Sequence, residues 1–88
     1  MQKNSNRQHI SAGELYVMLD REFRMRQSHA CGSCYILLPY RVDQPDRSKP
    51  NWEIVIPDEC PHNCAGLIED LIENYAKVYD LAPDNGNN

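Results

Sequence analysis

Four cysteines in two close pairs constrain this chain of 88 residues more than any other feature of its sequence. Two residues separate Cys31 from Cys34, and three separate Cys60 from Cys64. The segment between the pairs has the pattern of a β-hairpin, whose closure would bring the pairs together. Small domains bury a small share of their surface, so they often need a metal or a disulfide. The position of the hairpin therefore decides whether the four sulfurs meet.

The first predicted helix begins at Ser11, which is placed to form a capping box with Glu14. Ile10 and Leu15 occupy the two positions of a hydrophobic staple. The apolar stripe has the 3, 4 spacing of a helix and consists of Leu15, Met18, Leu19 and Phe23. We expect this helix to end near Gln27.

The hairpin is predicted from two segments rich in β-branched and aromatic residues, 35–42 and 52–56. A turn-rich loop at 43–50 joins them. Alternation places Ile36, Leu38, Tyr40 and Val42 on one face of the first strand, and Trp52, Ile54 and Ile56 on the core face of the second. Pro39 cannot donate to a ladder, which predicts an edge strand or a bulge. The opposite face retains Tyr35, Leu37 and Val55.

The second predicted helix begins near Cys60, with Pro61 at its first position, and ends before Pro83. Its apolar stripe is Leu67, Ile68, Leu71, Ile72, Tyr75, Val78 and Tyr79. The fold class is therefore α+β, a helix–β-hairpin–helix (αββα) with two helices packed on one face of a small antiparallel sheet. Residues 10–82 form the single domain, and the polar segments 1–9 and 83–88 are expected to be disordered tails.

Both cysteine pairs belong at the open end of this hairpin, because one pair precedes its first strand and the other follows its second. Four thiolates at this end would suit a tetrahedral zinc ion. Cys60 is expected at the N-cap of the second helix, where the helix terminus favours thiolate. The sequence therefore predicts one structural zinc, with four sulfur ligands: Cys31, Cys34, Cys60 and Cys64.

Other interpretations of the cysteines stay open. The 25 residues between Cys34 and Cys60 exceed the commonest zinc-ribbon spacing. His29 or His62 could replace one sulfur, although each is more simply an exposed residue. The thiols could also remain metal-free. Disulfides, an iron–sulfur cluster or redox chemistry are the remaining alternatives.

The rest of the sequence indicates a non-enzymatic protein. It contains no phosphate-binding glycine loop, no nucleophile elbow and no metalloprotease motif. A zinc ion held by four protein ligands would leave no position for substrate. The absence of a secretory signal or a long apolar run predicts a cytoplasmic protein without membrane association.

The sequence has features that suit two kinds of partner. The face that carries Tyr35, Leu37 and Val55 is a candidate surface for a protein partner or a homodimer. The alternative is nucleic-acid regulation through a cluster of arginines: Arg21, Arg24 and Arg26. The formal net charge of −4 makes nucleic acid the weaker prediction.

Overall fold

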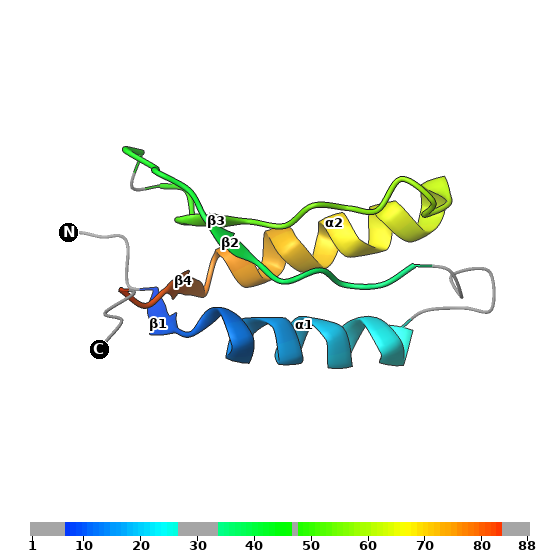
Figure 1. The fold of residues 1–88 in the computed structure, drawn as a ribbon, viewed down its shortest axis with the longest axis horizontal. Helices are drawn as coiled ribbons and strands as arrows, with labels where there is room; N and C mark the ends of the chain where they lie inside the picture. The colour runs from blue at the N-terminus through cyan, green and yellow to red at the C-terminus, as the bar shows by residue number, and fades with distance from the viewer. Residues whose placement is uncertain (1–6, 27–33, 47, 84–88) are drawn as a thin grey trace.

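The computed structural model describes residues 7–26, 34–46 and 48–83. It confirms an α+β fold in which two helices pack together and an antiparallel hairpin lies against them (Figure 1). A short parallel strand pair, which the sequence did not predict, completes the fold. In chain order the elements are β1 (Gln8–Ile10), α1 (Ala12–Arg26), β2 (Tyr40–Arg41), β3 (Trp52–Glu53), α2 (His62–Ala76) and β4 (Tyr79–Leu81).

Helix α1 begins as its sequence predicts. The Glu14 amide donates to the Ser11 hydroxyl oxygen at 3.1 Å, and the Ser11 amide donates to Glu14 Oε1 at 3.3 Å. These reciprocal bonds satisfy two amides that have no partner within the helix. Leu15, Leu19 and Phe23 are buried along one stripe. The capping box therefore fixes where α1 starts, and the stripe fixes which side faces the core.

The core lies between the two helices and the inner side of the hairpin. Figure 1 shows α1 and α2 running antiparallel to one another. The Tyr75 hydroxyl on α2 also donates to Glu22 on α1 at 3.0 Å. The buried hydrophobic residues come from α1, α2, the hairpin and β4: Leu15, Leu19, Phe23, Cys34, Ile36, Trp52, Cys64, Ile68, Leu71 and Leu81.

The parallel pair of β1 and β4 corrects two predictions. Residues 8 and 9 were assigned to the N-terminal tail, but His9 pairs with Asp80 and Ile10 with Leu81. Helix α2 was expected to extend through Tyr79, but it ends at Ala76. The helical spacing of Val78 and Tyr79 is a local signal, whereas the backbone of residues 79–81 gains hydrogen bonds from distant segments. The remaining parts of both predicted tails, 1–6 and 84–88, lie outside the described residues.

Asn51 and Trp52 attach the hairpin to β4. The Asn51 side chain accepts from the Leu81 amide at 2.7 Å and donates to the Leu81 carbonyl at 3.1 Å. The Asn51 amide donates to Asp80 Oδ1, and the Trp52 indole donates to the Tyr79 carbonyl at 3.0 Å. One side-chain amide thus takes the place of a neighbouring strand along the second edge of β4. We call β1, β4, Asn51 and Trp52 the strand end.

The hairpin is paired only near its loop. Tyr40 faces Glu53 and Arg41 faces Trp52, and the Val42 amide donates to the Asn51 carbonyl. Beyond Tyr40 and Glu53, no backbone hydrogen bond joins the two chain segments in the part of the chain that the structure describes. We call residues 34–39 the first arm and residues 54–60 the second arm.

The inward and outward positions of the first arm differ in part from the prediction. Ile36 is buried, but Leu38 and Tyr40 are 58% and 45% exposed, while Pro39 between them is buried. The alternation therefore shifts by one residue between Ile36 and Pro39, which is the effect of a bulge-like irregularity. On the second strand the prediction is confirmed, because Trp52 is buried and Val55 is exposed.

Candidate metal centre

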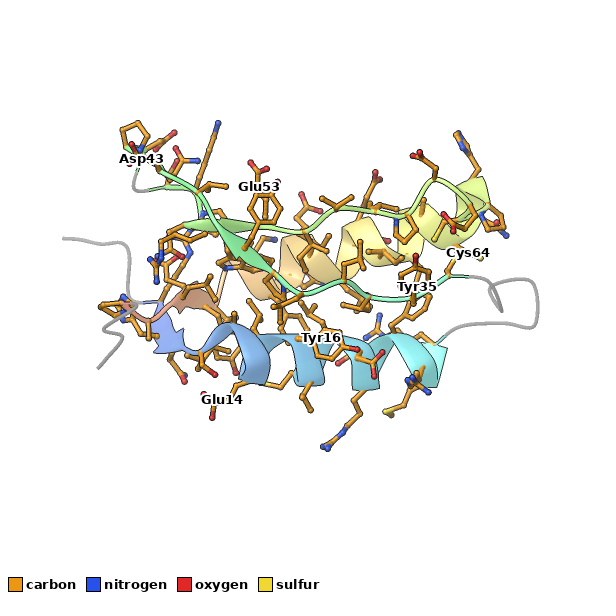
Figure 2. The ribbon with its side chains drawn as sticks, in the orientation of Figure 1. Glu14, Tyr16, Tyr35, Asp43, Glu53 and Cys64 are labelled. Carbon is orange, nitrogen blue, oxygen red and sulfur yellow. The ribbon has the colours of Figure 1, made fainter. Side chains whose placement is uncertain are left out.

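Three of the four predicted ligands lie in the described part of the chain. Cys34 begins the first arm, Cys60 ends the second arm, and Cys64 lies in the first turn of α2. Cys31 lies outside the described residues. Figure 2 shows Cys64 at the end of the molecule opposite the strand end, where the two arms also end. We call Cys34, Cys60 and Cys64 the cysteine end.

Cys34 and Cys60 meet across the open end of the hairpin. Both are free cysteines, and their side chains are in contact although 25 residues separate them in the chain. Burial raises the pKa of the Cys34 thiol to about 11, and the contact with Cys60 and the charge of Glu59 act in the same direction. Without a metal, the Cys34 thiol therefore stays protonated at neutral pH. The contact confirms that the hairpin brings one cysteine of each pair together.

The expected capping role of Cys60 is wrong. The N-cap of α2 is Pro61, which has an extended backbone and makes no capping hydrogen bond through its side chain. The Cys60 amide instead donates to the Pro57 carbonyl at 3.1 Å, which closes a turn before the helix. The first helical hydrogen bond runs from Ala65 to Pro61 at 2.9 Å. Because this turn uses residues 57–60, α2 starts later than the sequence indicated.

Cys64 lies deeper than the other two sulfurs. It is buried and belongs to the same hydrophobic cluster as Cys34, while the half-buried Cys60 packs against that cluster. The Cys64 sulfur takes part in a disulfide bond. The cysteine end therefore combines a pair of free thiols with a sulfur that is already oxidised.

The donor set fits zinc in chemical type but not in this oxidation state. Zinc binds thiolates, and a sulfur within a disulfide is not one. No group of three or more histidine, cysteine or acidic side chains in the described ranges is arranged to hold a metal ion. His62 is exposed at the start of α2, and His29 lies outside the described residues. Reduction of the disulfide is thus a condition for a site that uses four sulfurs.

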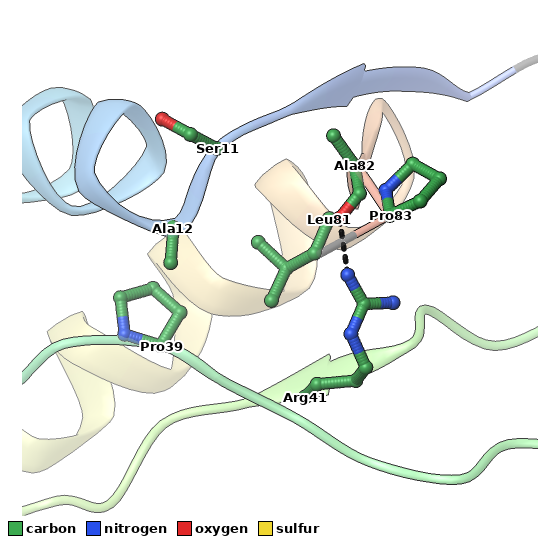
Figure 3. Close-up of a pocket in the computed structure, with 7 residues that line it drawn as sticks. All are labelled: Ser11, Ala12, Pro39, Arg41, Leu81, Ala82 and Pro83. Atoms are coloured by element: carbon green, nitrogen blue, oxygen red, sulfur yellow. Dashed lines mark hydrogen bonds between the residues drawn. The ribbon is translucent and has the colours of Figure 1, made fainter. Parts of the chain in front are cut away.

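A groove at the strand end has no counterpart among the features predicted from the sequence. It has a volume of about 370 Å³ and lies between the start of α1, the first arm and β4 (Figure 3). Its lining consists of Ser11, Ala12, Pro39, Arg41, Leu81, Ala82 and Pro83. Arg41 donates to the Ala82 carbonyl across the groove. No sequence pattern indicates this groove, because its wall depends on the unpredicted strand β4.

Two predicted interaction surfaces can be located. On the outer face of the hairpin, Tyr35 and Val55 are exposed, whereas Leu37 is half-buried. Along α1, Arg24 pairs with Asp20 at 2.9 Å and Arg26 pairs with Glu22 at 2.7 Å. The arginines therefore lie on an exposed face, and acidic neighbours offset part of their charge.

No family model matches this chain, and neither a curated protein nor a solved structure matches it. No helix within the described residues has the length and apolar character needed to span a bilayer.

Proposed function

We propose that this protein is a small non-enzymatic module for protein–protein interaction, and that one structural zinc stabilises its cysteine end when the thiols are reduced. The contact between the free thiols of Cys34 and Cys60 carries the proposal. Cys34 belongs to the same hydrophobic cluster as Cys64, and Cys60 from the opposite arm packs against that cluster. In the reduced chain, Cys31 would supply the fourth sulfur of a tetrahedral site.

Zinc would stabilise the part of the hairpin that has no backbone hydrogen bonds between its two arms. The arms are not joined by backbone bonds beyond Tyr40 and Glu53 within the described segments. A metal shared by Cys34, Cys60 and Cys64 would tie both arms to the first turn of α2. Its binding free energy would then contribute directly to the stability of the fold.

The outer face of the hairpin is the proposed interaction surface, and its partner is a protein with a basic surface. Tyr35, Leu38, Tyr40 and Val55 are exposed apolar or aromatic side chains on the hairpin. Exposed acidic residues accompany them: Glu53, Asp58 and Glu59. The chain as a whole has 13 acidic and 9 basic residues. This charge attracts a basic partner and opposes association with a second copy.

Nucleic-acid binding through Arg21, Arg24 and Arg26 is the weaker alternative. The ion pairs of Arg24 and Arg26 offset their charge, and the net charge of −4 opposes approach to phosphates. The other alternative is a thiol redox protein that binds no zinc. Measuring the zinc bound per chain distinguishes this alternative from the proposal.

Native mass spectrometry of the reduced protein with equimolar zinc tests the metal. We expect one zinc per chain, together with a lower melting temperature once a chelator is added. A reduced protein that takes up no zinc and melts unchanged with chelator would contradict the zinc proposal.

Peptide binding tests the interaction surface. The probe is an array of extended peptides with alternating basic and apolar residues, compared with acidic peptides of the same apolar content. We expect the basic peptides to bind and Val55→Ser to weaken them. Val17→Ser is the matched control, because Val17 on α1 is 49% exposed and Val55 is 54% exposed. Three results would each refute the assignment of a basic partner. These are an equal loss of peptide affinity in both variants, binding of the acidic peptides, and a stable dimer in solution.

A further inference from the structure

Cys34 and Cys60 are placed to react with each other as well as with a metal. Their thiols are in contact, they are free, and they come from opposite arms of the hairpin. We propose that a peroxide oxidises this pair to a Cys34–Cys60 disulfide, and that this bond locks the arms together and removes two sulfurs from the zinc site. The regulatory part rests on the proposed zinc function, whereas the disulfide itself does not.

Accessibility sets the order of the steps. Cys60 is half-buried and Cys34 is buried, so a small oxidant reaches the Cys60 sulfur first. Cys60 attacks one peroxide oxygen, the O–O bond breaks, and water leaves with the transferred protons, which gives a sulfenic acid on Cys60. The Cys34 sulfur then attacks the Cys60 sulfur. The S–O bond breaks and a second water leaves, taking the Cys34 proton.

The reaction balances: two thiols and one hydrogen peroxide give one disulfide and two waters. The two sulfurs lose two electrons, and the peroxide gains them. The Cys34 thiol lies beside the Cys60 sulfenic acid. Disulfide formation between these two side chains therefore competes with further oxidation of Cys60.

The location of the pair gives the bond a structural effect. Within the described residues, the backbone bonds of the hairpin lie at β2 and β3 and between Val42 and Asn51, and none joins the two arms. A bond between Cys34 and Cys60 closes the other end of the hairpin and constrains a loop of the unfolded chain. Oxidation and zinc binding would therefore both hold the arms, but they exclude each other because both use the same two sulfurs.

Disulfide mapping of the full-length protein tests the inference. The protein is treated with one equivalent of hydrogen peroxide, free thiols are blocked with N-ethylmaleimide, and linked peptides are identified after proteolysis. We expect a peptide pair linked through Cys34 and Cys60, and a melting temperature roughly 10 °C above that of the unoxidised metal-free protein. If the protein is loaded with zinc beforehand, it should release the metal as the Cys34–Cys60 disulfide forms.

Cys34→Ala supplies the matched variant, and it should retain the Cys60 sulfenic acid, which dimedone labels. Because the mapping uses the unaltered chain, it remains decisive even if this variant folds poorly. The proposed disulfide would be refuted if Cys34 and Cys60 were found linked to other cysteines. It would also be refuted if both were still alkylated by N-ethylmaleimide after peroxide treatment. If the linked peptide forms but the reduced protein takes up no zinc, the zinc function is refuted and the disulfide is not.

Discussion

The two ends of this molecule are held by different chemistry. At the strand end, β4 is bound on one edge by β1 and on the other by the Asn51 side chain and the Trp52 indole. At the cysteine end, the two arms meet through the sulfurs of Cys34 and Cys60. Hydrogen bonds at the strand end form in any oxidation state. On our proposals, the cysteine end would respond to metal and oxidant, while the strand end provides a fixed base.

On our proposals, this difference would separate folding from regulation. A hairpin with only four paired residues is too short to hold itself together in water. Asn51 and Trp52 hold its loop side through hydrogen bonds to β4. The proposed bonds at its open side, to zinc or between the two sulfurs, can therefore form and break while the loop side stays in place. If the two ends are independent, a change at one end should leave the stability of the other unchanged.

The largest effect is expected from Cys60→Ser in reduced protein loaded with zinc. Loss of one ligand should lower the free energy of unfolding by more than about 5 kcal/mol, because metal binding energy contributes to folding. In the presence of chelator the same substitution should cost about 1 kcal/mol, as expected for a half-buried thiol. Urea unfolding with and without chelator measures both values. An equal cost in the two conditions would mean that Cys60 is not a ligand.

Asn51→Ala should have the largest effect at the strand end. It leaves the amide and carbonyl of Leu81 without their partner, which should cost about 2–3 kcal/mol. The cost should be the same with zinc, with chelator and after oxidation. Asn74→Ala is the matched control on the exposed side of α2, and it should be neutral within about 0.5 kcal/mol. A cost for Asn51→Ala that depends on zinc would show that the ends are coupled.

A smaller effect is expected from Tyr75, which joins the helices between the two ends. Burial, together with the hydrogen bond to Glu22, raises the pKa of its hydroxyl. The unfolded chain therefore releases this proton first as the pH rises, so the stabilising effect is present below about pH 10 and is lost above it. Unfolding measured from pH 8 to 11 should show a steeper loss for the native chain than for Tyr75→Phe. Identical pH profiles would exclude a role for Tyr75.

The smallest effect is expected from Arg24→Ala. Its ion pair with Asp20 is exposed and lies within one helix, so the loss should be below about 0.5 kcal/mol. Thermal melting in low and high salt measures it. A loss comparable with that of Asn51→Ala would show that the arginine face contributes to the fold.

The sequence predicted the local features well and the distant ones poorly. The start of α1 followed from Ser11 and Glu14, whose bonds span three residues, and the meeting of Cys34 with Cys60 followed from hairpin connectivity. By contrast, β1 and β4 have three residues each, too few for an alternating pattern to be recognised. Their pairing depends on segments about 70 residues apart in the chain, including the bond from the Gln8 amide to the Val78 carbonyl.

The candidate site shows the same limit. The cysteine pairs could be placed at one end of the hairpin, but the start of α2 was misplaced because the turn from Pro57 to Cys60 resembles a first helical turn in sequence. The spacing of the cysteines does not indicate that Cys64 is part of a disulfide bond. The oxidation state of Cys64 depends on redox conditions as well as on the chain.

Amide hydrogen exchange of the reduced protein, with zinc and then with chelator, tests the central claim most directly. We expect chelation to speed exchange in the arms and in the first turn of α2, while the Leu81 amide, which donates to Asn51, stays equally protected. Equal acceleration at both ends would contradict the account, and so would unchanged exchange in the arms.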